Sequence, residues 1–242
     1  MPAISVRGLR KEYGSTIALN NVSFEVKEGT FFGCFGPNGA GKTTLTRILT
    51  GQIQPTSGDA LVLGFDSHLG SMEIRENVGI VPEAESPPSY LTASEFLYFV
   101  GKVRKIDKID ARIDRWLHYF DMEDSHGTLC KDLSKGTKQK VMLSAAFIHE
   151  PRLLFLDEPF INLDPIYQKK LREYLIQLRE EGRTIFMCSH ILEIAQRLCQ
   201  EVLILNRGNI VANESITGLT SRGEDLESTF MRLVGGENGL TP

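Results

Sequence analysis

The feature that most constrains this chain is a glycine-rich segment at residues 36–44, Gly-Pro-Asn-Gly-Ala-Gly-Lys-Thr-Thr. It fits the pattern G-x-x-x-x-G-K-[ST] at every fixed position. The run before it, Phe31–Phe35, is apolar and predicts a buried strand, and the run from Leu45 to Leu49 predicts a helix. A strand, a glycine loop and a helix in this order indicate a phosphate-binding loop. The alternative, a glycine-rich turn before an ordinary helix, leaves the fixed positions unexplained.

The residue types in this loop match the chemistry of a polyphosphate site. Glycines at 36, 39 and 41 let the backbone curl with its N–H groups pointing inward, and the helix that begins near Lys42 adds its positive end. We expect Lys42 to reach the β- and γ-phosphates and the Thr43 hydroxyl to ligate Mg²⁺. The expected phosphate-binding residues are Gly36, Pro37, Asn38, Gly39, Ala40, Gly41, Lys42, Thr43 and Thr44.

Composition excludes several other classes of protein. The chain has 242 residues, of which 41% are hydrophobic and 24% charged, which is typical of one or two globular domains. Its net charge of −4 argues against binding to nucleic acid or to an anionic membrane surface. We find no apolar run long enough to cross a bilayer and no signal peptide, and the four cysteines form no C-x-x-C pair. These features predict a cytosolic protein with reduced thiols, whose membrane part, if it has one, is another chain.

A second cluster of polar residues follows an apolar strand predicted at Leu153–Leu156. Asp157 and Glu158 come directly after it, and burying carboxylates is costly unless a cation or a proton compensates. We expect Asp157 to share a Mg²⁺ with Thr43, and Glu158 to accept a proton from the attacking water. A solvated acidic loop is the alternative.

His190 follows another predicted strand, Thr184–Cys188. A histidine at a strand end is usually a polar surface residue, but here we expect a third contact to the γ-phosphate or the attacking water. Strands that end near Gly36, Asp157 and His190 would bring all three groups to the carboxyl edge of one parallel sheet.

The remaining sequence predicts helices in its middle and strand–helix alternation towards its end. Residues 84–150 indicate a helical insert, with a capping box from Thr92 to Glu95 and a second helix from Asp107. We expect Asp164-Pro165 to begin a helix, Ser189 to cap another, and residues 206–209 to turn a hairpin. The apolar face predicted for the first insert helix consists of Phe96, Phe99, Val100 and Val103.

Taken in order, these motifs resemble those of the ATP-binding subunit of ABC transporters, over the chain up to about residue 213. The resemblance implies that Tyr13 stacks on adenine and that the loop Asn162–Asp164 faces a partner subunit. Leu133–Thr137 stands where the family usually has LSGGQ; Ser134 and Gly136 are kept, and by resemblance they contact the ATP of the other subunit. Glu83 stands where many members have glutamine in a loop that senses Mg²⁺, so we add it to the expected metal ligands Thr43 and Asp157.

The resemblance also implies the fold: an α/β P-loop NTPase core of the RecA type with a mostly parallel sheet, an N-terminal antiparallel β subdomain and an inserted α-helical subdomain. We expect a single domain over residues 1–234. It divides into a core (1–83 and 151–213), the insert (84–150) and a C-terminal helical segment (214–234), with a flexible tail at 235–242.

The implied function is Mg²⁺-dependent ATP hydrolysis by two copies, or by one copy and a homologous ATPase, that sandwich two ATP molecules. Glu158, His190 and Lys42 are the expected catalytic residues. The resemblance further implies a separate integral membrane subunit, efflux as the direction of transport, and a place on the inner face of the membrane. One alternative is a soluble ABC-type ATPase that acts on ribosomes or DNA, although such proteins usually carry two ATPase halves or a long coiled-coil insert. Another is a monomeric P-loop kinase or GTPase, but the Asn-Lys-x-Asp motif of GTPases is absent.

Overall fold

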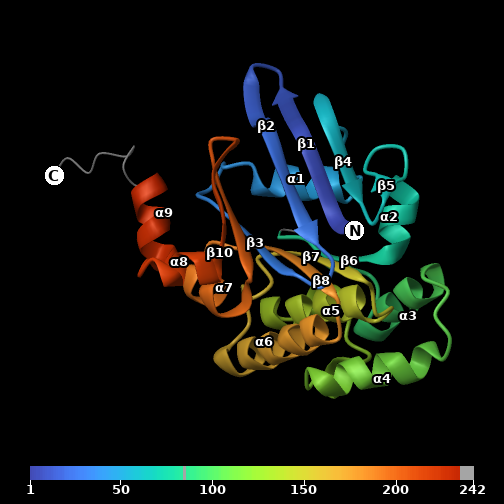
Figure 1. Ribbon diagram of the computed structural model, residues 1–242. Helices are drawn as coiled ribbons and strands as arrows, with labels where there is room; N and C mark the ends of the chain where they lie inside the picture. The colour runs from blue at the N-terminus through green and yellow to red at the C-terminus, as the bar shows by residue number, and fades with distance from the viewer. Residues whose placement is uncertain (84–85, 235–242) are drawn as a thin grey trace.

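Two β-sheets with helices packed around them form the protein (Figure 1). The computed structural model describes residues 1–83 and 86–234. The tail predicted at 235–242 lies outside the described residues.

The first sheet is antiparallel and contains the N-terminal strands in the order β2-β1-β4-β5. β2 alternates buried and exposed residues over its second half, as a strand with one covered face should. The expectation of an N-terminal antiparallel unit is therefore confirmed. β1 is twelve residues long, and its pairing with β2 continues to Tyr13. The strands are β1 (Pro2–Tyr13), β2 (Thr16–Lys27), β4 (Ser57–Val62) and β5 (Phe65–Asp66).

The second sheet places the functional motifs, with the strand order β10-β9-β3-β8-β7-β6. Neighbours from β9 to β6 pair in parallel, and β10 closes one edge as the antiparallel arm of the predicted hairpin. Every residue of β3, β7 and β8 is buried, as their continuous apolar runs require in a sheet covered on both faces. The strands are β3 (Phe31–Phe35), β6 (Val78–Val81), β7 (Leu153–Asp157), β8 (Thr184–Cys188), β9 (Glu201–Asn206) and β10 (Asn209–Ser215).

Apolar side chains form a core on each face of this second sheet. Between the two sheets, Phe32 stacks on Phe24 and on Phe186, with ring centroids 5.5 and 5.7 Å apart. Under the helices of the other face, Trp116 packs against Phe147 and Tyr174. Both cores hold the central strands rigidly, which fixes the positions of the residues that follow them.

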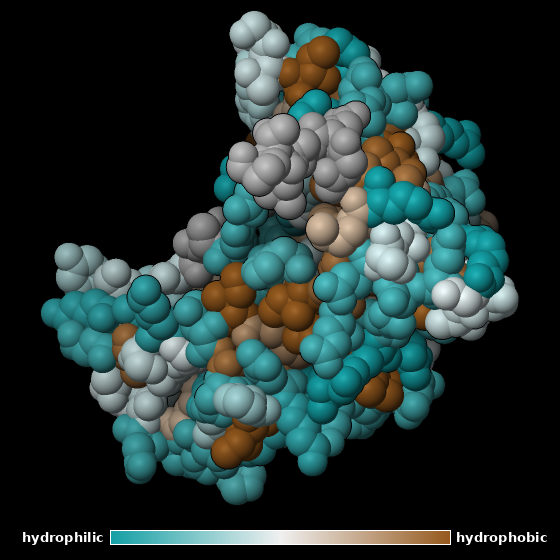
Figure 2. All heavy atoms as spheres, turned by 90° about the vertical axis from the view of Figure 1, so that its left-hand side faces the viewer, coloured by the Kyte–Doolittle hydropathy of each residue, from teal (hydrophilic) through white to brown (hydrophobic). Residues whose placement is uncertain are grey.

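The helices pack around both sheets, with α1 between them in contact with β2, β4 and β7 (Figure 1). Their bounds are α1 (Lys42–Leu49), α2 (Ser71–Asn77), α3 (Ala93–Val103), α4 (Ile109–Tyr119), α5 (Lys135–Phe147), α6 (Pro165–Glu180), α7 (Leu192–Leu198), α8 (Ile216–Ser221) and α9 (Leu226–Val234). The sequence reading missed α2, a helix of seven residues. In the described residues, none of these helices has both the length and the apolar character needed to cross a bilayer. In Figure 2 the apolar atoms form separate small groups on a mostly hydrophilic face.

The capping box of α3 is confirmed, because Thr92 accepts from the Glu95 backbone and Glu95 accepts from the Thr92 backbone. The apolar face predicted for α3 is partly wrong. Phe99 is 58% exposed and Val103 61% exposed. The buried positions of α3 are instead Ala93, Leu97 and Gly101, since small residues let α4 and α5 approach this helix closely.

Two expectations near the end of the chain also need correction. Ser189 does not cap α7, which begins three residues later at Leu192 without a side-chain cap. β10 continues to Ser215, two residues beyond the expected end of the core at 213. The cap of α6 by Asp164 with Pro165 in the first turn is confirmed. All four cysteines are free and buried, as expected.

Candidate functional site

A cavity of about 440 Å³ lies at the carboxyl ends of β3 and β7. It brings together ten of the predicted ATP and Mg²⁺ residues from the phosphate loop, the first sheet and the β6 and β7 ends, together with Glu158. Three residues that the sequence reading did not name, Thr16, Ile17 and Ala18, complete its wall. The predicted residues that line it are Tyr13, Asn38, Gly39, Ala40, Gly41, Lys42, Thr43, Thr44, Glu83, Asp157 and Glu158.

The loop between β3 and α1 requires glycine at two positions. Gly41 has φ +108°, and a Cβ there would lie 2.5 Å from the carbonyl oxygen of Ala18. A Cβ on Gly36 would lie 2.3 Å from the carbonyl oxygen of Leu205. Because Gly41 is the N-cap of α1 and carries no side chain, the first turn of this helix has no side-chain cap. Its N–H groups are thus left for an external anion.

Lys42 lies at the cavity with its side chain folded back over the loop. Its Nζ donates to the carbonyl oxygen of Gly36 at 2.7 Å and to that of Pro37 at 3.1 Å, and the residue is 9% exposed. A buried ammonium held only by neutral carbonyls can interact more strongly with a phosphate, because charge-assisted hydrogen bonds are about twice as strong as neutral ones.

Three carboxylates meet opposite Lys42. Asp157 is 3% exposed and Glu158 is 6% exposed, and Glu83 accepts a hydrogen bond of 3.5 Å from the Thr43 hydroxyl. Burial, and after it the charges of Glu83 and Glu158, raise the pKa of Asp157 to about 6. A group of buried oxygens with excess negative charge is a suitable environment for a hard divalent cation.

The donor set fits Mg²⁺ in particular. Mg²⁺ in proteins usually keeps several waters and takes one or two carboxylates together with substrate phosphates. Thr43 and Asp157 provide such a partial set, with Glu83 beside them. Within residues 1–83 and 86–234, no group of three or more histidine, cysteine or acidic side chains is arranged to hold a metal. A cation here would therefore depend on phosphate oxygens for part of its coordination.

Glu158 is held more firmly than the sequence reading anticipated. Its Oε1 is 2.8 Å from His190 Nδ1, and its Oε2 accepts a hydrogen bond of 3.1 Å from Ser189 Oγ. Its backbone N–H donates to the Cys188 carbonyl at 2.9 Å, and its φ is +50°. His190, expected to contact a phosphate or water, thus contacts Glu158. Ser189, expected to cap a helix, orients the same carboxylate.

Tyr13 closes the cavity on the side of the first sheet. Its ring is 48% exposed and lies 5.0 Å from Lys11 Nζ. An aromatic face that lines the cavity and is open to solvent is available to stack on a base.

Of the predicted site residues, Gly36, Pro37 and His190 do not line this cavity but contact residues that do. Ser134 and Gly136 lie away from it. Both lie at the first turn of α5, where Ser134 Oγ accepts from the Thr137 N–H at 3.1 Å. The Thr137 hydroxyl, at the position where the family usually has glutamine, lies 2.9 Å from Ser134 Oγ. The positive end of α5 is therefore outside the cavity that the phosphate loop lines.

Comparison with known proteins supports the reading of these motifs. Residues 19–161 match the family described as ABC transporter. An uncharacterized ABC transporter ATP-binding protein of Methanocaldococcus jannaschii is 38% identical over 87% of this chain and 76% of its own length. The ABC transporter ATP-binding protein NatA of Bacillus subtilis is 34% identical over 90% of this chain and 92% of its own length. The Nod factor export ATP-binding protein I of Rhizobium meliloti is 36% identical over 87% of this chain, which spans only 63% of that relative.

Solved structures of ABC transporter subunits have a similar fold. The structure of an ATP-binding subunit of an ABC transporter superposes with a TM-score of 0.88 at 29% identity, over 96% of this chain and 99% of that chain. A dimeric bacterial ABC transporter cassette gives a TM-score of 0.81 at 26% identity, over 88% of this chain and 98% of that chain. The predicted α/β fold, a P-loop core with a mostly parallel sheet, is confirmed.

Proposed function

The chain belongs to the ABC transporter family of ATP-binding ATPases, and we propose that it is the subunit that drives a separate integral membrane transporter by closing with a second copy around two ATP molecules. Each copy gives its phosphate loop to one ATP and the first turn of α5 to the other. The division of the chain into core, helical insert and C-terminal segment belongs to the same proposal, with the insert passing the motion to the membrane subunit.

One observation carries the proposal. Eleven of the expected site residues line one cavity, whereas Ser134 and Gly136 lie at a helix N-terminus away from it. A helix N-terminus supplies backbone N–H groups and a positive dipole to an anion, which is only part of a nucleotide site. The two halves complement each other if two copies pair symmetrically, each supplying what the other lacks. The similarity to a dimeric ABC transporter cassette supports this arrangement.

The residues divide the chemistry as follows. The glycine loop, the first turn of α1 and Lys42 bind the β- and γ-phosphates, and Thr43, Asp157 and Glu83 hold Mg²⁺, which neutralises phosphate charge when bound. Glu158 accepts the proton of the attacking water. His190 and Ser189 keep its carboxylate in place, so that no reorganisation is needed during the reaction. Tyr13 stacks on the adenine.

The proposed direction is efflux. Its support is a relative that carries the name Nod factor export ATP-binding protein I. The expected location is the inner face of the cell membrane, through contact with the membrane subunit.

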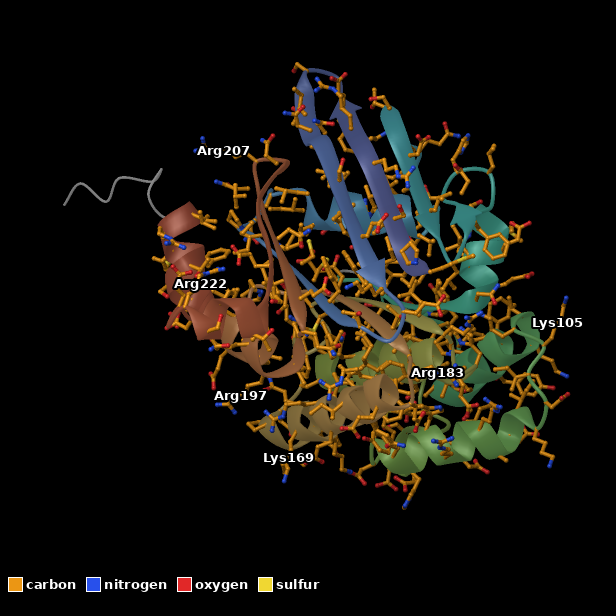
Figure 3. All side chains as sticks on the ribbon, in the orientation of Figure 1. Lys105, Lys169, Arg183, Arg197, Arg207 and Arg222 are labelled. Atoms are coloured by element: carbon orange, nitrogen blue, oxygen red, sulfur yellow. The ribbon has the colours of Figure 1, made fainter. Side chains whose placement is uncertain are left out.

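The net charge of −4 gives no support to a role on ribosomes or DNA. The labelled residues in Figure 3, Lys105, Lys169, Arg183, Arg197, Arg207 and Arg222, are spread over different elements of the molecule. Nucleic-acid binding usually needs basic residues gathered on one face or along one helix.

Affinity purification from the native cell tests the proposal. The Glu158→Gln chain, with ATP, is captured from detergent-solubilised membranes and, in parallel, from the ribosome fraction. We expect one integral membrane protein to co-purify in stoichiometric amount from membranes and to be lost with Lys42→Met. Recovery with ribosomes alone would overturn the proposal.

A further inference from the structure

The loop at residues 158–164, which joins β7 to α6, is held by glutamine side chains from two different helices. Gln139 of α5 donates from Nε2 to the carbonyl oxygen of Pro159 at 3.1 Å. Gln168 of α6 donates from Nε2 to the carbonyl oxygens of Phe160 and Leu163, at 3.3 and 3.1 Å. The loop is therefore tied both to the helix that faces the partner and to a helix of the core.

The contact between α5 and this loop is also close in packing. A Cβ on Gly136, in the first turn of α5, would lie 2.8 Å from the carbonyl oxygen of Asn162. Phe160 and Leu163 are 2% and 7% exposed, so the loop is anchored in the core at both points. Because this contact is closely packed, a shift of α5 would displace the backbone of the loop.

The residue that Gln139 contacts is next to Glu158. Pro159 has a φ fixed by its ring, so its peptide unit has little freedom to absorb a displacement. On the other side, Glu158 is fastened to β8 and its following residues through Cys188, Ser189 and His190. The position of Glu158 is thus set between two supports, one of which belongs to α5.

We propose that Gln139 is a positioning residue that links the two ATP sites: it transmits the docking of α5 on the partner's nucleotide to Glu158 of its own chain. The proposal rests on the paired arrangement put forward above. In that arrangement α5 of one copy contacts the ATP held by the other copy. The hydrogen bond from Gln139 to Pro159 then makes the alignment of one copy's Glu158 depend on the occupancy of the other copy's site.

The first test compares two glutamines that hold the same loop. Gln139→Met keeps the length of the side chain and removes the donor to Pro159; Gln168→Met does the same on α6. We expect Gln139→Met to lower kcat about fivefold, the equivalent of one ordinary hydrogen bond, and to bring the Hill coefficient for ATP down to one. Gln168→Met keeps the wild-type Hill coefficient, even where kcat falls. Gln139→Lys, which restores a donor of similar reach, recovers cooperativity.

An unchanged Hill coefficient in Gln139→Met overturns the proposal. An equal loss of cooperativity in Gln168→Met also overturns it, because any loss of a hydrogen bond to the loop would then have the same effect. Thermal unfolding of each variant identifies a variant that has not folded. If Gln139→Met is that variant, Gln139→Leu, which also lacks the donor to Pro159, replaces it in the comparison with Gln139→Lys.

The second test uses mixed dimers in which one copy carries Glu158→Gln and cannot turn over. Gln139→Met is placed either in the active copy or in the inactive copy. We expect the rate to fall only when it is in the active copy, because Gln139 acts on Glu158 of the same chain. A fall only when it is in the inactive copy means that Gln139 contacts the partner's nucleotide directly, and overturns the proposal.

Failure of the paired arrangement itself is recognised separately. In that case Glu158→Gln chains form no dimer with ATP, and the mixed-dimer test cannot be assembled. A dimer that forms normally and shows no effect of Gln139→Met contradicts the role of Gln139 alone.

Discussion

Two helices of this protein begin at residues that the sequence associates with phosphate, and their surroundings differ. α1 follows the glycine loop, has Gly41 as an N-cap without a side chain, and opens into a cavity that also holds Lys42 and Asp157. α5 is capped by the Ser134 hydroxyl and opens into no such cavity. The first helix end lies at a cavity that one chain builds. In the proposed pairing, the second helix end contributes to the ATP site of the other copy.

The difference has a physical basis. At α1 the anion must approach the backbone closely, so glycine is needed and the N–H groups are left free. At α5 the serine side chain satisfies one N–H, and its hydroxyl is itself the group that can donate to a phosphate. Substitutions at the two helix ends should therefore separate binding of ATP from its hydrolysis.

The largest effect is expected at the α1 end. Lys42→Met removes the charge that faces the phosphates, and should weaken ATP binding to the isolated chain by roughly a hundredfold, the scale of hydrogen bonds to charged groups. Isothermal titration with ATP measures it. The exposed Lys169→Met on α6 is the control, since Lys169 pairs only with Glu173 on the helix surface. Equal affinities for the Lys42 variant and wild type would place the phosphates elsewhere.

Ser134→Ala should reduce hydrolysis and leave the binding of ATP to the isolated chain intact, unlike Lys42→Met. Binding of ATP to the isolated chain stays unchanged, and steady-state hydrolysis falls by roughly 10²-fold, the usual cost of removing a donor aimed at the reacting group. Ser215→Ala is the matched control, because Ser215 caps α8 through Gly218 in the same way. Both variants lose about 1 kcal/mol of stability as cap mutants, but only the first should lose activity. Comparable activities would remove Ser134 from the site.

Asp157→Asn tests whether the buried charge at the α1 site makes the free energy of unfolding depend on pH. The pKa of Asp157 in the folded protein is about 6, above the value of 3.8 for the unfolded chain. The folded state therefore binds the proton more tightly, and this group destabilises the protein increasingly as pH rises from about 4 to about 6.

At pH 7, without nucleotide, Asp157→Asn should then raise the free energy of unfolding by about 3 kcal/mol while it impairs Mg²⁺-dependent hydrolysis. Urea unfolding at pH 4 and pH 7 measures the gain, which should disappear at pH 4. Asp59→Asn on β4 makes the same change of charge at an exposed position. A gain that is independent of pH would mean that the folded protein does not raise the pKa of Asp157.

The smallest effect is expected at Tyr13. Tyr13→Ala removes one stacking surface and should weaken ATP binding by about 1 kcal/mol, the lower end for base stacking, because the ring is half exposed. Tyr13→Phe keeps the ring and should bind normally, and Tyr90→Ala, at a fully exposed tyrosine, is the control. Fluorescence titration with an adenine nucleotide measures it; if Tyr13→Ala binds as tightly as Tyr13→Phe, the base does not stack there.

Much of the fold follows from local sequence. Continuous apolar runs at residues 31–35, 153–156 and 184–188 predict buried parallel strands, and all three are found. The residues after these strands meet at one sheet edge because parallel strands place their carboxyl ends together. The motif of the phosphate loop is equally local, so its residues are found together.

The parts that sequence missed depend on tertiary contacts. Which face of α3 is buried is decided by the close approach of α4 at Gly101, and the larger apolar residues Phe99 and Val103 are left outside. Ser189 looks like a helix cap from its position, but the left-handed backbone at Glu158 turns that carboxylate towards its hydroxyl. The bond from Gln139 to Pro159 joins residues twenty apart and has no local signal.

The most direct test of the account is the association state of Glu158→Gln with ATP. Loss of the general base should slow hydrolysis by roughly 10²–10⁴-fold, so that any ATP-bound pair accumulates. Analytical ultracentrifugation at saturating ATP should show a dimer that binds one ATP per chain, and Ser134→Ala in the same background should weaken it. A Glu158→Gln chain that binds ATP and remains a monomer would contradict the claim that two copies share each site.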